Sequence, residues 1–101
     1  MFGGWQTRVI HERAGLRREI KKANSHRVGS NAARKIAEEL AKSYGDGIYR
    51  FIRYRGEFNR SKSRFGRPVC EEVFRFKVQG GLVAGNPRPG GSRPCEEFFG
   101  Y

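Results

Sequence analysis

The chain has 101 residues, 37% of them hydrophobic and 13% aromatic, which fits one folded domain with a single modest core. Fifteen arginines and six lysines against ten acidic residues give a formal net charge of +11, which favours a polyanionic partner. No apolar run reaches membrane-spanning length, and Cys70 and Cys95 lack the spacing typical of zinc sites, so we expect no membrane contact, metal or cofactor.

The first element that the sequence predicts is a helix over residues 9–23. Its apolar residues fall on one helical stripe, namely Val9, Leu16, Ile20 and Ala23, although Gly15 interrupts the pattern. A secondary basic patch consists of Arg13, Arg18, Lys21 and Lys22 on the opposite face, Arg17 beside the apolar stripe and Arg27 in the following connection. Helices often carry such charges for solubility alone, so this patch is a weaker indication of binding.

A second helix is predicted over residues 30–44, and its pattern is the clearest in the chain. Apolar residues recur at the spacing of a core-facing helix, at Ala33, Ile36, Ala37, Leu40, Ala41 and Tyr44. Ser30 or Asn31 suits the N-cap, and Gly45 suits the left-handed position after the last turn. The solvent face is nearly balanced in charge, so we interpret this helix as scaffold rather than as binding surface.

Two strands follow, over residues 48–55 and 73–78, and we expect them to pair as an antiparallel hairpin. The core should form where the second helix packs on the hairpin, with Ile36, Leu40 and Tyr44 against Phe74, Phe76 and Val78. The predicted fold class is α+β, with two helices followed by an antiparallel β-hairpin or small sheet. Residues 1–78 form the expected domain, and residues 79–101 a Gly/Pro-rich tail for which a late strand stays open.

The strongest functional signal lies between Arg50 and Arg67, where cations and aromatic rings alternate and Glu57 is the one acid. Proteins that bind single strands or RNA combine cations that hold phosphates with rings that stack on bases. We assign the candidate nucleic-acid site to Arg53, Arg55, Phe58, Arg60, Lys62, Arg64, Phe65 and Arg67. For Tyr49, Phe51 and Tyr54 we favour a place in the core.

These features favour a non-enzymatic, cytoplasmic protein that binds nucleic acid or a nucleoprotein complex. The alternative is a small inhibitor of the phage or plasmid type, which docks on an acidic protein partner such as a nucleic-acid enzyme. Its interface anchors would be the aromatic ends of the chain, at Phe2, Trp5, Phe98, Phe99 and Tyr101. The sequence allows a Cys70–Cys95 disulfide but does not require one.

The order helix, helix, strand, strand over residues 5–78 is similar to that of small RelE-like ribonuclease toxins. That resemblance implies RNA cleavage without a metal, with Tyr54, Arg64 and His26 as the candidate catalytic residues. The resemblance is one of topology and no motif supports it, so we favour binding without catalysis.

Overall fold

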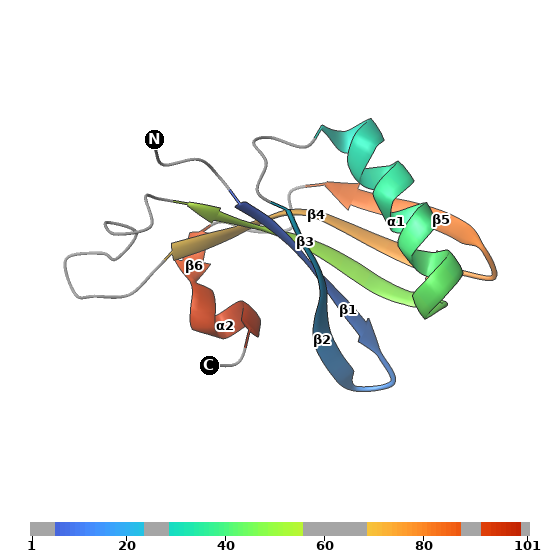
Figure 1. Ribbon diagram of the computed structural model, residues 1–101, viewed down its shortest axis with the longest axis horizontal. Coiled ribbons are helices and arrows are strands. Elements are labelled where there is room, and N and C mark those ends of the chain that lie inside the picture. Colours follow the sequence, from blue (N-terminus) through green and yellow to red (C-terminus); the bar gives the residue numbers. More distant parts are fainter. Residues whose placement is uncertain (1–5, 24–28, 56–68, 88–91, 100–101) are drawn as a thin grey trace.

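The computed structural model describes residues 6–23, 29–55, 69–87 and 92–99. These ranges form a six-stranded antiparallel sheet with one long helix and one short helix (Figure 1). Along the chain they are β1 (Gln6–Arg13), β2 (Leu16–Ala23), α1 (Ser30–Tyr44), β3 (Gly47–Arg55), β4 (Val69–Gln79), β5 (Leu82–Pro87), β6 (Ser92–Pro94) and α2 (Cys95–Phe99). The strand order across the sheet is β2-β1-β3-β4-β5, and β6 pairs with the start of β4, whereas β5 pairs with its end.

The predicted first helix is wrong, and with it the order of two helices before a hairpin. Residues 9–23 belong to a β-hairpin, β1–β2, whose two-residue turn holds Ala14 and Gly15 at φ 53° and 84°. The sheet is covered on both faces here, so the neighbours Val9 and Ile10 are both buried and hide the alternation of a strand. An extra residue, Ile20, bulges from β2 and breaks the alternation again.

The second predicted helix is confirmed with the expected bounds, as α1. Ala33 and Ala37 are fully buried where α1 meets the sheet, and Gly45 ends the helix at a positive φ of 85°. The expected cap at Ser30 or Asn31 is wrong, because the N-cap is Gly29 and no side chain closes that end.

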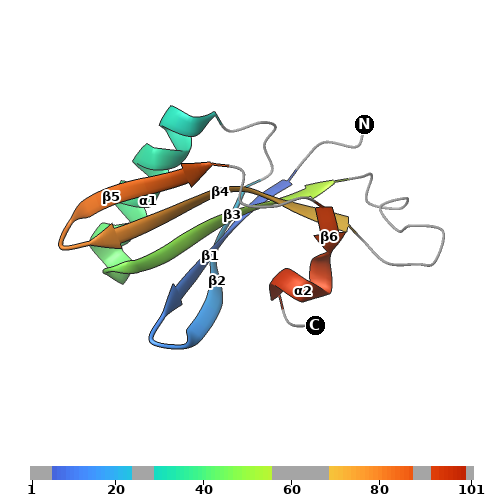
Figure 2. The same ribbon diagram turned by 180° about the vertical axis from the view of Figure 1, so that it is seen from behind.

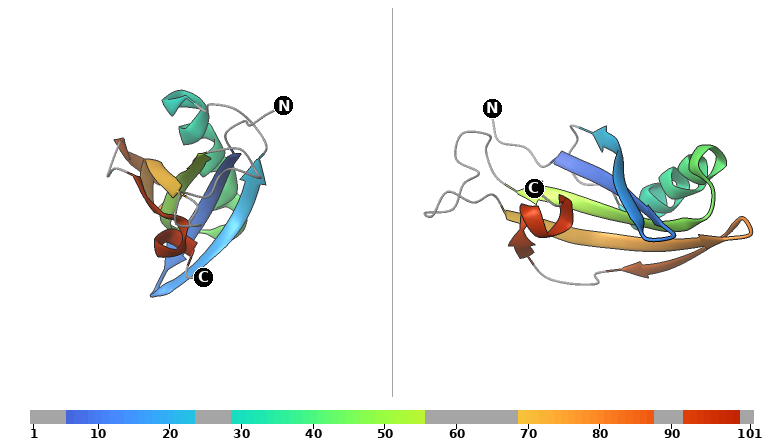
Figure 3. Two further views of the ribbon diagram at one scale, coloured as in Figure 1. Left: turned by 90° about the vertical axis from the view of Figure 1, so that its left-hand side faces the viewer. Right: turned by 90° about the horizontal axis from the view of Figure 1, so that it is seen from below.

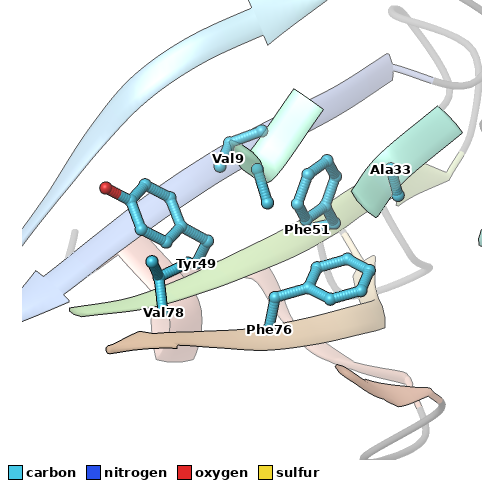
Figure 4. Close-up of a cluster of buried hydrophobic side chains, with 7 residues drawn as sticks. Val9, Ala33, Tyr49, Phe51, Phe76 and Val78 are labelled. Carbon is cyan, nitrogen blue, oxygen red and sulfur yellow. The ribbon is translucent and has the colours of Figure 1, made fainter. Parts of the chain in front are cut away.

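The strands predicted over residues 48–55 and 73–78 do pair antiparallel, as β3 and the longer β4. Their side chains on the α1 face form the main core with β1 and the helix, through Val9, Ala33, Ala37, Tyr49, Phe51, Phe76 and Val78 (Figure 4). Ile36, Leu40, Tyr44 and Phe74 pack against this cluster and are partly buried, so the predicted helix-to-hairpin contact is confirmed. Phe51 also makes edge-to-face contacts with Phe74 and Phe76.

A second, smaller cluster lies on the other face of the sheet. It consists of Ile10, Ile52, Cys70, Cys95 and Phe98, and α2 covers it. The helices α1 and α2 lie toward opposite ends of the sheet (Figure 2) and on opposite sides of it (left view of Figure 3). A disulfide between Cys70 and Cys95 joins β4 to the start of α2. The described part of the expected tail thus contains β5, β6 and α2.

A second bulge interrupts β4 at Val73, since Phe51 pairs with Phe74 while Ile52 pairs with Glu72. The bulges at Ile20 and Val73 flank the central pair of strands at nearly the same level, next to the rung that joins Val9 to Phe51. Both extra side chains pack against the core on the α1 face. Bulges bend the strand that carries them and increase its local twist, so both bulges act at this level of the sheet.

Candidate functional site

Most of the predicted site lies outside the described residues. This applies to Phe58, Arg60, Lys62, Arg64, Phe65 and Arg67, which belong to residues 56–68, and to the side chain of Arg55. Arg53 is described, and its Nη2 lies 3.2 Å from Glu71 Oε1 on the paired strand β4. The positive charge of Arg53 is therefore balanced within the fold.

The secondary basic patch lies on the β1–β2 hairpin instead of on a helix. Its described side chains, those of Arg13, Arg17, Arg18 and Lys21, are all exposed. The side chain of Lys22 and all of Arg27 lie outside the described part of the chain. The structure therefore brings five of the six patch residues onto one hairpin, four of them with described side chains.

The two acidic residues of the hairpin are occupied by other arginines. Glu12 Oε2 lies 2.7 Å from Nη1 of Arg50, and Glu19 Oε2 lies 3.8 Å from Nε of Arg8. Within the described ranges no acidic side chain forms an ion pair with the four exposed patch cations. The hairpin therefore presents uncompensated positive charge to solvent.

Strand geometry distributes these cations over both faces of the hairpin. Arg17 lies opposite Glu12 and Arg18 lies opposite His11, and successive residues of a strand point to opposite faces. The guanidinium of Arg18 lies 6.0 Å from the ring centre of Tyr44, which places it on the α1 face. Arg17 therefore points to the face that α1 leaves uncovered.

The hairpin turn also exposes an aliphatic side chain. Leu16 is 76% exposed and Leu82, just after the β4–β5 turn, is 78% exposed; these are the large exposed hydrophobic residues of the described ranges. An open recess of about 510 Å³ lies beside the first turn, lined by Glu12, Arg13, Ala14, Gly15, Leu16, Arg17 and Ile48. Sequence reasoning had placed Leu16 on the core side of a helix, which is wrong.

Sequence reasoning also missed a buried ionic network on the face opposite α1. Glu72 is 4% exposed and accepts hydrogen bonds from Nε and Nη2 of both Arg50 and Arg75, at 2.8–3.0 Å. Burial alone would raise the pKa of Glu72, but the hydrogen bonds from Arg75 and Arg50 outweigh it and lower that pKa. The signal in the sequence was the pair Glu71-Glu72, whose members point to opposite faces and pair with different arginines.

The described residues contain no group of three or more His, Cys, Asp or Glu side chains that could hold a metal ion. His11 is buried, with Nε2 3.0 Å from the Asp46 carbonyl oxygen and the ring stacked on Tyr49, so it has a structural role. In the same ranges no helix is both long and apolar enough to cross a membrane.

The structure contradicts the topology on which the similarity to RelE-like toxins rests, and it buries one of the predicted interface anchors. The similarity to RelE-like toxins required two helices before the strands, and the chain has a β-hairpin in place of the first helix. Of its candidate residues, His26 and Arg64 lie outside the described residues, as does the side chain of Tyr54. Phe98, an expected interface anchor, is 2% exposed and belongs to the second core cluster. The other expected anchors lie outside the described part of the chain, namely Phe2, Trp5, Tyr101 and the side chain of Phe99.

Comparison with known proteins gave no match for this chain among protein-family models, curated proteins or solved structures.

Proposed function

We propose that this protein binds nucleic acid through its phosphates and catalyses no reaction. The observation that supports this most directly is the uncompensated charge of the β1–β2 hairpin, where both acidic residues are engaged by other arginines. Exposed arginines form bidentate hydrogen bonds with phosphate oxygens, and each neutralised phosphate releases a condensed counterion. The formal charge of +11 adds long-range attraction to the same kind of partner.

The predicted cationic segment of residues 56–68 starts where β3 ends, whereas the β1–β2 turn lies beside the start of β3. The nine residues of β3 separate these two ends by about 26 Å, from a rise of about 3.3 Å per residue. That distance equals about eight phosphate steps along one strand of DNA. A nucleic-acid strand that reaches both ends of β3 therefore spans about eight phosphate steps.

The test is a salt titration of binding with two double variants of equal charge. Arg17→Gln with Lys21→Gln removes two cations from the hairpin, and Lys35→Gln with Lys42→Gln removes two exposed cations from α1, where Glu38 and Glu39 lie nearby. The hairpin variant should make the slope of log affinity against log salt shallower by about 1–2 units, and the α1 variant should change it much less.

Two outcomes would contradict this proposal. Equal losses in both variants would mean that net charge, and not the hairpin, determines affinity. If the unaltered protein fails to bind DNA or RNA even at low salt, the nucleic-acid function itself is refuted.

The second candidate is docking on an acidic protein, as an inhibitor or adaptor. The exposed Leu16 and Leu82 favour it, because aliphatic side chains at hairpin turns can serve as interface anchors. Affinity purification with and without nuclease separates the two functions. A partner that is retained after nuclease treatment favours docking on a protein, and one that is lost favours nucleic acid.

A further inference from the structure

The β1–β2 hairpin ends the sheet, with β2 as its outer strand (Figure 1). Charged side chains on an edge strand can simply prevent pairing with other chains. The other edge strand, β5, contains no charged residue and ends in Pro87, so of the two sheet edges it is β2 that presents cations. A polyanion would therefore meet the sheet at the β2 edge.

The cations of β2 point to both sides of the hairpin. Arg18 and Lys21 lie opposite His11 and Val9, whose side chains face α1, while Arg17 points to the other face. A flat binding surface would use one of these faces. Because β1 is paired with β3 as far as Glu12, the part of the hairpin that can enter a groove is its turn end, where Arg17 and Arg18 point to opposite sides. A groove with a phosphate backbone on each side would contact both sides of this end at once.

The grooves of nucleic acids differ in whether such a hairpin fits. The major groove of B-form DNA is about 12 Å wide and admits a two-stranded β-ribbon, whereas the major groove of A-form RNA is deep and narrow. Single-strand binding relies on exposed aromatic rings, and residues 6–23 of the hairpin contain no Phe, Tyr or Trp. The hairpin therefore suits duplex DNA best.

The turn of the hairpin offers an apolar contact for this groove. Leu16 follows the tight turn at Ala14 and Gly15 and is 76% exposed, with Arg17 beside it. The apolar group that a major groove displays is the C5-methyl of thymine. A leucine at the leading end of a ribbon between two phosphate backbones is placed to contact such methyl groups.

We propose that the β1–β2 hairpin enters the major groove of double-stranded DNA, with Arg17 toward one phosphate backbone, Arg18 and Lys21 toward the other, and Leu16 against thymine methyl groups. This inference rests on the proposed function and adds to it the duplex, the groove and the apolar contact.

The test compares binding to four nucleic acids of matched sequence, each 20 nucleotides per strand: duplex DNA, the same duplex with uracil in place of thymine, duplex RNA and single-stranded DNA. Uracil lacks the methyl group and leaves base pairing unchanged. The variants are Leu16→Ala and Leu82→Ala, two equally exposed residues after the two turns at this end of the sheet. Circular dichroism checks that both variants are folded.

The unaltered protein should bind the thymine duplex more tightly than duplex RNA or single-stranded DNA. It should also prefer thymine over uracil by about fourfold for each methyl group contacted, from the free energy of burying one such group. Leu16→Ala should remove the preference for thymine, and Leu82→Ala should leave that preference unchanged. Tight binding to the thymine duplex with this pattern supports the proposal.

The proposal is overturned if single-stranded DNA or duplex RNA binds as tightly as duplex DNA, or if Leu16→Ala keeps the thymine preference. Either result leaves salt-dependent nucleic-acid binding in place, so it refutes the groove and not the proposed function. Absence of binding to all four nucleic acids at low salt refutes both.

Discussion

The disulfide between Cys70 and Cys95 should provide a large part of the stability of this protein. It joins β4 to α2 across 25 residues of sequence, and α2 has only five residues, too few to form a helix alone. In the chain-entropy model, a cross-link that closes a loop of this length stabilises the folded state by about 3.5 kcal/mol at 25 °C. Total stabilities of domains are roughly 5–15 kcal/mol, so the loss of this bond should be easy to measure.

The assay is urea unfolding followed by far-ultraviolet circular dichroism, with and without a phosphine reductant. With a urea dependence of roughly 1–2 kcal/mol per molar, reduction should lower the unfolding midpoint by about 1.8–3.5 M. The control is the double variant Cys70→Ala with Cys95→Ala, which should be less stable and insensitive to reductant. An unaltered midpoint after complete reduction would refute the argument that this cross-link limits the freedom of the unfolded chain.

Three further predictions concern other parts of the molecule. Because the folded pKa of Glu72 lies below the ordinary value of 4.5, its ion pairs should stabilise the fold above about pH 4.5 and be lost as the pH falls through the folded pKa. Glu72→Gln should cost roughly 1–3 kcal/mol at pH 7, because Arg50 keeps its ion pair with Glu12, and it should flatten the acid limb of a stability–pH profile; an unchanged limb would contradict this. Gly47→Ala should destabilise by about 1–3 kcal/mol in urea unfolding, because φ is 142° and a Cβ would lie 2.5 Å from Nε2 of His11; wild-type stability would contradict that strain. Changing the loop residues Arg60, Lys62 and Arg64 to Ala should leave circular dichroism unchanged and make the slope of log affinity against log salt shallower by about 2–3 units. An unchanged slope would exclude this loop as a nucleic-acid contact.

Those parts of the fold that bury one face could be predicted from the sequence. The helix α1 sets alanines and larger apolar residues on one stripe, so its bounds followed directly. The hairpin β1–β2 could not be found in the same way, because Val9 and Ile10 are buried on opposite faces. The bulge at Ile20 then left Leu16 and Ile20 at a spacing that suits a helix as well as an irregular strand.

The candidate site was predictable as a set of charges but not as a geometry. Its exposed cations on β2 belong to the patch that the sequence indicated, yet their division between two faces depends on strand register. Arg53 lost its place as a free cation because the same register sets Glu71 opposite it. Such pairings join residues far apart in the chain, and periodicity alone contains no information about them.

The bulges have a consequence for the direction in which the β1–β2 turn points. Figure 1 shows this turn diverging from the β4–β5 turn, and the added twist of β2 arises at Ile20, about 13 Å from Leu16 by strand rise. Ile20 packs against the core on the α1 face, so the bulge fixes the direction of the turn end of the hairpin relative to the core. Deleting Ile20 would keep the pairing partners of Glu19 and Lys21 and every charge of the hairpin. It would nevertheless remove the bulge and change the direction of the β1–β2 turn. Substitutions at Ile20 can therefore alter the orientation of the hairpin toward a partner without changing a residue that contacts that partner.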